Sequence, residues 1–287
     1  MPITGAARLA GIMGWPVAHS RSPALHGFWL TEHGIDGAYV PLAVPPDRLE
    51  QALRALPALG FRGCNLTIPH KQAALAVMDR IDPFARRIGA MNTVVVAADG
   101  SLEGSNTDVF GFRENLREQA PEWHPLAGPA IVLGAGGSAR SVVAALSAAG
   151  VREIRLVNRT LERARSLASE LAAPETRISV HPWEARAEML GGGGILVNTT
   201  SLGMDKEPPL DFDLIALPMS AVVVDIVYVP LETRLLAAAR RRGHRVVDGL
   251  GMLLHQGRPG FAAWFGVAPQ VTPALRVAML ATFAGDK

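Results

Sequence analysis

The stretch PAIVLGAGGSARSVVAALSAAG (129–150) constrains the fold more than any other part of the sequence. A short apolar run precedes a glycine-rich turn, and an apolar segment of helical length follows and ends at Gly150. The order of strand, turn and helix is the first half of a βαβ unit. Four later strings each read as a further strand, with segments of crossover length between them: EIRLVNRT, GILVNTTSLGM, AVVVDIVYVP and HRVVDG. This alternation predicts an α/β fold with a doubly wound parallel sheet and helices on both of its faces.

The glycine turn itself predicts a dinucleotide site. Residues 134–139 fit the pattern G-x-G-x-x-A between a strand and a helix. Gly134 permits the tight turn, Gly136 lets the backbone approach a pyrophosphate, and Ala139 permits close packing of the helix. The N–H groups at the helix start favour the anion. The alternative is a glycine-rich turn with no ligand. The residues expected to bind the dinucleotide are Gly134, Ala135, Gly136, Gly137, Ser138 and Ala139.

The next strand indicates which dinucleotide is bound. It ends in Asn158-Arg159-Thr160, and Arg163 follows one helical turn later. An NAD site usually has Asp or Glu here to bind the ribose 2′-hydroxyl, whereas a guanidinium binds a 2′-phosphate in bidentate fashion. We therefore expect NADP rather than NAD as the cofactor, although Arg159 also reads as an ordinary surface residue.

Composition excludes several classes of protein. The 287 residues are 49% hydrophobic and 19% charged, which is typical of a globular chain of one large or two ordinary domains. A net charge of +2 does not indicate a nucleic-acid partner, and no apolar run approaches the length of a membrane span. Cys64 is the single cysteine, so we expect a buried thiol and a cytoplasmic protein. The eight histidines show no metal-ligand spacing, so no metal is expected.

Polar side chains also gather outside the nucleotide unit. Ser22 reads as the N-cap of a helix with Pro23 at its first position, where hydroxyls suit a carboxylate. In NLTIPHK (65–71), Pro69 ends a strand and leaves Lys71 beyond it, at the sheet edge where ligands of α/β folds collect. Singly, each residue also reads as a cap, a strand-edge amide or a surface side chain. Together they are typical of a small-polyol site: Ser20, Ser22, Asn65, Thr67, Lys71, Asn92, Asp108 and Gln256.

The sequence resembles the shikimate/quinate dehydrogenase family. The matching strings follow the family order over nearly the whole chain, and their combination is highly specific although no single string is. They are GWPVAHSRSPALH, NLTIPHK, IGAMNTVV, GSNTD, GAGGSAR, NRT, NTTSLGM, DIVY-P and DGLGMLLHQG. The resemblance implies an NADPH-dependent reduction of 3-dehydroshikimate to shikimate, on the route to aromatic amino acids, by a monomer or a homodimer.

The resemblance also implies a role for each residue. Lys71 and Asp108 would be the catalytic pair, and Ser20 and Ser22 would hold the substrate carboxylate. The ring hydroxyls would be held by Asn65, Thr67, Asn92, Asp108 and Gln256. Tyr228 and Gly249 would line the cleft, and the cofactor contacts would include Thr200, Ile226 and Gly249. Residues 1–108, completed by helices within 250–287, would form a substrate-binding domain, and residues 109–249 an NADP-binding Rossmann domain.

The sequence departs from the family pattern at three positions. Gly27 stands where Asn is common, Leu66 where Val is common, and Val109 where Gly is frequent. None of them is a proposed reacting group, but Gly27 bears on the packing of the first helix.

Two alternative functions stay open. One is an NAD-preferring quinate/shikimate dehydrogenase, which the absence of an acidic residue in NRT argues against. The other is a non-catalytic, shikimate-sensing regulator, which the presence of Lys71, Asp108 and the intact glycine turn disfavours.

Overall fold

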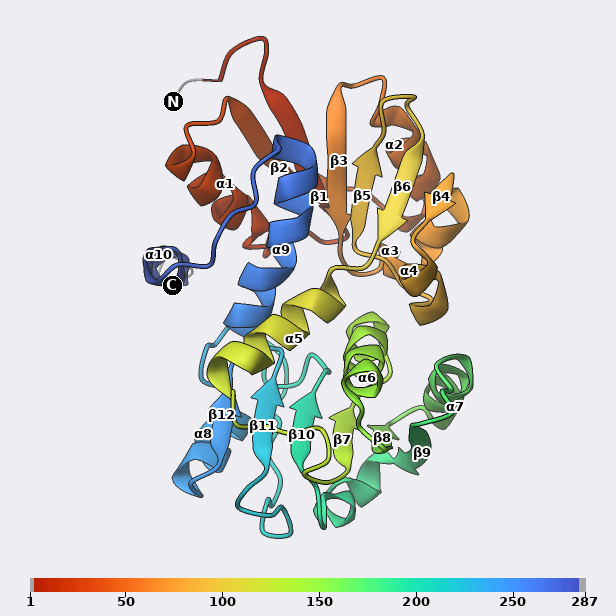
Figure 1. The fold of residues 1–287 in the computed structure, drawn as a ribbon, viewed down its shortest axis with the longest axis vertical. Helices are drawn as coiled ribbons and strands as arrows, with labels where there is room; N and C mark the ends of the chain where they lie inside the picture. The colour runs from red at the N-terminus through yellow and green to blue at the C-terminus, as the bar shows by residue number, and fades with distance from the viewer. Residues whose placement is uncertain (1–2, 284–287) are drawn as a thin grey trace. The chain divides into compact units, whose positions relative to one another are not determined.

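The computed structural model describes residues 3–283, and these fold into two units, each built around one six-stranded sheet (Figure 1). Unit 1 comprises the described residues up to Thr107 and those from Leu253 onward, and unit 2 is the continuous segment Asp108–Met252. The predicted α/β class is therefore confirmed. In the described part of the chain, no helix has the length and apolar character that crossing a membrane requires.

The sheet of unit 1 is mixed. Its order is β2-β1-β3-β5-β6-β4, with β1 parallel to β2 and β3, and with β5 antiparallel to β3 and β6. The turn between β5 and β6 contains Asp99-Gly100, and Gly100 has a φ of +81°, as the predicted hairpin requires. The strands are β1 (Arg8–Gly14), β2 (Gly37–Ala43), β3 (Phe61–Leu66), β4 (Arg80–Ile81), β5 (Thr93–Val96) and β6 (Leu102–Ser105).

Helices cover both faces of this sheet. Side chains alternate along a strand, so Cys64 and Leu66 of β3 face the core beneath α2 and α4, while Asn65 faces the opposite side. On that opposite side α1 and α9 bring aromatic rings around Tyr39 of β2. The helices of unit 1 are α1 (Ser22–Glu32), α2 (Leu49–Ala55), α3 (His70–Ala73), α4 (Pro83–Ile88), α10 (Pro273–Ala281) and the part of α9 (Gly249–Phe265) from Leu253 onward.

The start of α1 differs from the prediction. Arg21 is the N-cap residue, and Ser22 is the first residue inside the helix rather than its cap. The Ser20 side chain explains the difference, because its Oγ accepts the Ser22 backbone N–H at 3.3 Å and so serves one of the donors at the helix start. Both hydroxyls still lie at the N-terminal end of α1, although only Ser20 acts on the backbone there.

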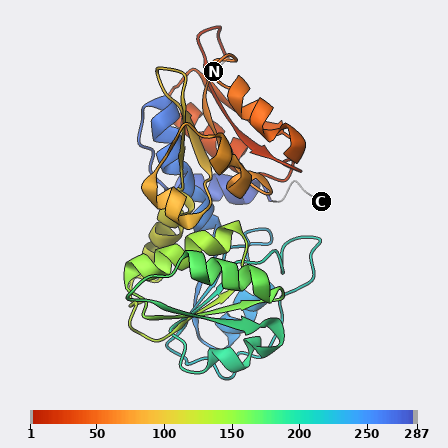
Figure 2. The same cartoon turned by 90° about the vertical axis from the view of Figure 1, so that its right-hand side faces the viewer.

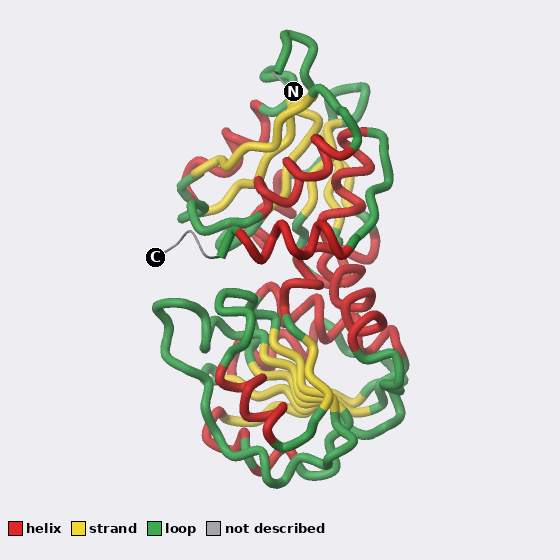
Figure 3. Tube along the Cα trace, turned by 90° about the vertical axis from the view of Figure 1, so that its left-hand side faces the viewer, coloured by secondary structure: helices red, strands yellow, loops and turns green. Residues whose placement is uncertain are grey.

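The sheet of unit 2 is entirely parallel, in the order β12-β11-β10-β7-β8-β9. Figure 2 shows α6 and α7 together along one face of the sheet, and Figure 3 shows its strands fanned by their twist. Helix α8 packs against β11 and β12. The strands are β7 (Ala130–Leu133), β8 (Glu153–Asn158), β9 (Arg177–Pro182), β10 (Ile195–Asn198), β11 (Val222–Asp225) and β12 (Arg245–Val247). The helices are α5 (Asp108–Gln119), α6 (Gly137–Ala149), α7 (Leu161–Glu170), α8 (Arg234–Arg241) and the start of α9.

Every strand predicted for unit 2 is present, but β9 was missed. It is the edge strand beside β8, and none of its six residues is fully buried. An edge strand pairs on one side only, so RISVHP lacks the apolar run that marks the interior strands. Helix α6 ends at Gly150 with a φ of +98°, where glycine adopts the left-handed conformation without cost.

Candidate active site

The segment that carries Lys71 is held in place by backbone hydrogen bonds. Beyond the end of β3, the Thr67 N–H donates to Met13 O at 2.9 Å, and the His70 N–H donates to Thr67 O at 2.8 Å. The Lys71 carbonyl accepts the Met91 N–H at 2.8 Å. Lys71 therefore lies half-buried in the short helix α3. Its backbone is fixed beside Met91, the neighbour of Asn92 in the sequence.

Asn92 is the centre of a buried hydrogen-bond network in unit 1. Its Nδ2 donates to Thr107 Oγ1 at 3.0 Å and to Gln256 Oε1 at 3.1 Å. Its Oδ1 accepts the Thr107 N–H at 2.7 Å. Asn65 joins the same network, because its Nδ2 donates to Asn92 O at 3.0 Å and to Thr93 Oγ1 at 3.1 Å. The structure thus brings three of the predicted polyol-binding amides together, and the bond between Asn92 and Gln256 joins positions 164 residues apart.

A tyrosine that the sequence did not point to joins this network. The Tyr39 hydroxyl donates to Asn65 Oδ1 at 2.6 Å. Burial raises the pKa of Tyr39 well above its ordinary value, so the phenol stays protonated. Of the predicted carboxylate ligands, Ser22 is buried and Ser20 is half-buried.

Two of the predicted site residues belong to unit 2, Asp108 at its first position and Tyr228 after a strand. Asp108 is the first residue of α5, is 4% exposed, and follows directly on Thr107 of the Asn92 network. Tyr228 is half-buried and lies in the segment after β11.

The glycine turn has the form that a pyrophosphate site needs. Gly134 has a φ of +106°, and a Cβ there would lie 2.8 Å from Thr199 Oγ1. Gly136 is exposed at the N-cap of α6, and a Cβ there would meet nothing within 4 Å. Open space therefore borders Gly136 at the N-terminus of α6, where a dinucleotide phosphate is expected. Ala139 is fully buried against the sheet, as close packing of α6 requires.

The end of β8 presents cations and no carboxylate. Arg159 and Arg163 are exposed, on either side of the start of α7. The Asn158 side chain donates to Thr160 O at 2.7 Å and so closes the turn between β8 and α7. Both guanidinium groups are accessible to a ligand phosphate, which is the arrangement predicted for NADP.

The other predicted cofactor residues lie at the ends of β10 and β11. Thr200 donates from Oγ1 to Asn198 Oδ1 at 2.7 Å, in the loop after β10. A Cβ at Gly249 would overlap Ile226 O, so only glycine lets α9 start this close to the segment after β11. Gly249 and Ile226 therefore lie side by side within unit 2.

A buried carboxylate that the sequence reasoning missed holds these two strand ends together. Asp225 is 0% exposed, and its Oδ1 accepts Asn198 Nδ2 at 2.9 Å and the Val227 N–H at 3.0 Å. Its Oδ2 accepts Thr233 Oγ1 at 2.7 Å. Burial outweighs these three donors and raises the pKa of Asp225 from 3.8 to about 6.

We expect Asp225→Asn to change how stability depends on pH. An ionised Asp225 disfavours the folded state above pH 6, by about 3 kcal/mol at about 1.4 kcal/mol per pKa unit. The cost decreases as the pH falls toward 3.8 and disappears below that value, where the side chain is protonated in both folded and unfolded chains. Asparagine is neutral throughout. Relative to the unchanged chain, the free energy of unfolding of the variant should therefore fall by about 2 kcal/mol between pH 7 and pH 4.

Urea denaturation of both proteins at pH 4, 5, 6 and 7 measures this difference. A difference that stays constant across the range would contradict the raised pKa.

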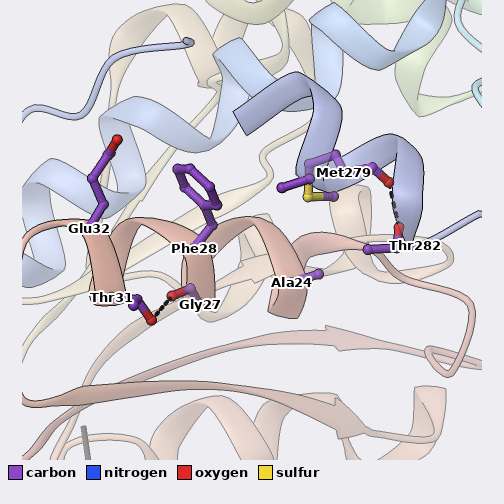
Figure 4. A pocket seen from close by; sticks show the side chains of 8 residues that line it. Ala24, Gly27, Phe28, Thr31, Glu32, Met279 and Thr282 are labelled. Atoms are coloured by element: carbon purple, nitrogen blue, oxygen red, sulfur yellow. Dashed lines mark hydrogen bonds between the residues drawn. The ribbon is translucent and has the colours of Figure 1, made fainter. Parts of the chain in front are cut away.

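A hollow in unit 1 lies away from the predicted site. It has a volume of about 390 Å³ between α1 and α10, and Figure 4 shows the side chains around it. A Cβ at Gly27 would meet nothing within 4 Å, so no neighbouring atom requires glycine at this position of α1. The lining contains none of the predicted site residues: Ala24, Gly27, Phe28, Thr31, Glu32, Ala278, Met279 and Thr282.

Cys64 is buried as predicted. Its side chain is fully inaccessible, and burial raises the pKa of the thiol above its ordinary range. Among residues 3–283, no group of three His, Cys, Asp or Glu side chains is placed to hold a metal ion.

Comparison with known proteins gives consistent matches over both units. Residues 12–94 match the family described as shikimate dehydrogenase substrate binding domain, and residues 125–203 match the family described as shikimate / quinate 5-dehydrogenase. The chain is 61% identical over 278 residues to the shikimate dehydrogenase (NADP(+)) of Paramagnetospirillum magneticum, which covers 97% of this chain and 100% of that protein.

Solved structures resemble the whole chain. The quinate dehydrogenase of Corynebacterium glutamicum in complex with NAD has a TM-score of 0.88 and 32% identity, covering 96% of this chain and 99% of that one. The shikimate 5-dehydrogenase of Thermus thermophilus in complex with NADP(H) and shikimate has a TM-score of 0.81 and 39% identity, covering 96% of this chain and 98% of that one.

Proposed function

We propose that this chain, which belongs to the shikimate dehydrogenase family, catalyses the reversible NADPH-dependent reduction of 3-dehydroshikimate to shikimate. The observation that carries the proposal is the buried amide network of unit 1, with the Lys71 backbone anchored beside it. A ring that carries several hydroxyls needs closely spaced donors and acceptors, and Asn65, Asn92 and Gln256 supply them. The function is thus an oxidoreductase that uses NADP and acts on a small polyhydroxylated acid.

The substrate is proposed to bind by its two chemically different ends. The hydroxyls of Ser20 and Ser22, at the start of α1, suit the carboxylate, because the N-terminal end of a helix favours an anion. The ring hydroxyls are assigned to the amide network, to Thr67 beside Lys71 and to Asp108. Tyr228 is proposed as a further substrate contact from unit 2.

Lys71 is proposed as the general acid. Reduction of a ketone creates negative charge on its oxygen, and a lysine ammonium supplies both a positive charge and a proton there. Asp108, which the chain joins directly to Thr107, is proposed to orient the ammonium and to accept a substrate hydroxyl. In the reverse direction the same lysine, as the neutral amine, accepts the proton from the shikimate hydroxyl.

The residues of unit 2 fit NADP. The cofactor, when bound, supplies the hydride that reduces the carbonyl carbon. Gly136 and the start of α6 are proposed to hold the pyrophosphate, while Arg159 and Arg163 hold the 2′-phosphate at the end of β8. Thr200, Ile226 and Gly249 are proposed to contact the cofactor from the ends of β10 and β11 and from the start of α9.

We expect Arg159→Asp to weaken NADPH selectively. The aspartate would repel the 2′-phosphate and would offer an acceptor to the free ribose hydroxyl of NADH. Loss of a charge-assisted contact costs about 1.5 to 3 kcal/mol, so the KM for NADPH should rise at least about tenfold while the KM for NADH changes much less. Steady-state kinetics with each cofactor measures both constants.

Arg165→Asp is the matched control, since Arg165 is also exposed on α7 and the charge change is identical. It should leave the KM for NADPH within about twofold. An unchanged KM for NADPH in Arg159→Asp itself would remove Arg159 from the site and favour the NAD-using alternative.

The proposed function is tested by comparing four substrate pairs, shikimate or quinate with NADP or NAD. The proposal expects shikimate with NADP to give the highest kcat/KM. Preference for quinate with NAD would support the catabolic alternative, and absence of turnover with every pair, together with binding of shikimate, would support a regulator.

A further inference from the structure

The side chain of Asn198, at the end of β10, uses all of its hydrogen-bonding capacity within unit 2. Its Oδ1 accepts the Thr200 N–H at 3.0 Å and the Thr200 hydroxyl at 2.7 Å. Its Nδ2 donates to Leu202 O at 3.1 Å and to Asp225 Oδ1 at 2.9 Å. An asparagine amide has two N–H donors and an oxygen with two lone pairs, so nothing is left for a ligand. Asn198 is also 0% exposed. Its side chain therefore acts on the loop after β10 and on Asp225.

Asp225 extends this arrangement to the segment after β11. The oxygen that accepts Asn198 Nδ2 also accepts the Val227 N–H at 3.0 Å. Val227 lies between Ile226 and Tyr228, which are proposed to contact the cofactor and the substrate. The Ile226 N–H donates to Asn198 O at 3.2 Å, which joins the same two segments a second time. One carboxylate oxygen, Asp225 Oδ1, therefore fixes the loop after β10 and the segment after β11 relative to each other.

Thr199 fixes the loop after β10 against the glycine turn. Its N–H and its hydroxyl both donate to Leu133 O, at 2.9 Å and 2.6 Å. A Cβ at Gly134 would lie 2.8 Å from Thr199 Oγ1, so no space separates the two residues. Thr199 is therefore fixed beside the turn that is proposed to hold the pyrophosphate, and Asn198 fixes the next residue, Thr200.

The strand order indicates which half of a dinucleotide these segments face. Strands β11, β10 and β7 are neighbours, and β8 lies on the other side of β7 (Figure 1). All of them are parallel, so the segments that follow them share one edge of the sheet. The order reverses between β7 and β10, and a dinucleotide binds across such a switch point. Because Arg159 and Arg163 beyond β8 are assigned to the 2′-phosphate of the adenosine half, we expect the nicotinamide half beyond β10 and β11.

We propose that Asn198 and Asp225 are positioning residues for the nicotinamide ring of the cofactor. Neither touches the cofactor, because both side chains are fully buried. They act by holding two backbone segments, Thr200–Leu202 and Ile226–Tyr228, where these place the ring for hydride transfer. The proposal rests on the proposed function and deepens it, because it gives the assigned contacts at Thr200 and Ile226 a structural cause.

Asp225→Ala tests the proposal, because it removes the oxygen that joins the two segments. A displacement of about 1 Å at the reacting atoms can cost about a hundredfold in rate, so kcat should fall about tenfold or more. The dihydronicotinamide of NADPH is fluorescent, so its anisotropy decay reports the mobility of the bound ring without any turnover. At saturating NADPH and without substrate, the variant should show a fast ring motion that the unchanged chain lacks.

A cofactor fragment shows whether the rest of the cofactor site stays intact. The compound 2′-phospho-ADP-ribose lacks only the nicotinamide, and its proposed contacts are at Gly136 and Arg159. Its Kd, measured by calorimetric titration, should therefore stay within about twofold in Asp225→Ala. A global loosening of unit 2 would instead weaken the fragment as well.

Two matched variants separate positioning from stability. Asp225→Asn keeps an oxygen toward Asn198 and Val227, and its amide nitrogen can donate to Thr233 Oγ1, so kcat and the ordered ring should be retained. Thr233→Val removes the bond to the other carboxylate oxygen, Asp225 Oδ2, and the cap of α8, but leaves Asp225 Oδ1 in place. It should lower Tm and leave kcat within about twofold.

An ordered ring in folded Asp225→Ala would overturn the proposal, and so would an equal loss of ring order in Thr233→Val. A weakened fragment in Asp225→Ala would also overturn it. Failure of the unchanged chain to bind NADPH would instead overturn the proposed function.

A second measurement needs no substitution and decides the question if Asp225→Ala does not fold. It follows two backbone N–H signals of the unchanged, isotope-labelled chain by NMR, those of Thr200 and Val227, which are held by Asn198 and Asp225. Both signals should shift when NADP binds, whereas 2′-phospho-ADP-ribose at saturation should leave them in place. Signals that respond equally to both ligands, or to neither, would overturn the proposal.

Discussion

Replacing Lys71 with alanine is expected to lower kcat by about a hundred- to ten-thousandfold, a loss of about 3 to 5 kcal/mol of transition-state stabilisation. The reason is that the ammonium acts where the ketone oxygen gains charge, which happens only as the hydride arrives. Shikimate binding should suffer far less, because the serines and the amide network remain. Steady-state kinetics gives kcat and KM, and circular dichroism confirms that the variant is folded.

Two further variants sharpen this test. Asp108→Ala should worsen both kcat and KM, and the double variant should be little slower than the worse single one, because the two residues are proposed to act as a unit. Lys206→Ala removes an exposed lysine from unit 2 and should leave kcat unchanged. A folded Lys71→Ala protein with near-normal kcat and weakened substrate binding would make Lys71 a binding residue only.

The largest effect on stability is expected from Gly63→Ala. Gly63 lies in β3 with a φ of +146°, and a Cβ there would overlap both Val94 O and Trp264 Nε1. These two atoms are hydrogen-bonded to each other at 2.9 Å. Alanine must therefore displace a backbone carbonyl, break a buried bond and adopt a strained conformation, for a total of about 4 kcal/mol. Thermal unfolding should show a decrease in Tm on the order of 10 °C.

Gly60→Ala is the matched control, because Gly60 also has a positive φ, of +76°, but a Cβ there would meet nothing within 4 Å. Its cost should be the conformational strain alone, about 1 to 2 kcal/mol. Equal losses of Tm in the two variants would show that the overlap at Gly63 relaxes without cost.

The parts of the fold that could be predicted are those with a local chemical cause. The turn at Gly134, the end of α6 at Gly150 and the hairpin at Gly100 each need a backbone conformation that glycine adopts readily, so a few residues are enough to indicate them. The parallel sheet of unit 2 follows in the same way from the alternation of apolar runs. Because RISVHP is an edge strand without an apolar run, β9 gave no such signal.

The site could be predicted only in part, because its hydrogen bonds join distant segments. Tyr39 reads as an ordinary buried aromatic in GAYVPLA, and it meets Asn65 only because β1 pairs with both β2 and β3. Asp225 reads as the end of an apolar strand, and its partners Asn198 and Thr233 come from other elements. The strings that carry the family resemblance indicated which residues are expected to contact substrate and cofactor. The residues that hydrogen-bond to them, such as Tyr39 and Asp225, were identified only in the structure.

The composition of unit 1 from two separate stretches of chain has a consequence for biosynthesis. Trp264 donates to Val94 O from 170 residues away, and Trp29 donates to Gln270 O across 241 residues. The ribosome synthesises the whole of Asp108–Met252 before it makes the residues from Leu253 onward that complete the core of unit 1. Domains generally fold during translation in the order in which they emerge. The nucleotide-binding unit is therefore complete in sequence first. The N-terminal strands of unit 1 lack part of their covering until α9 and α10 have been translated.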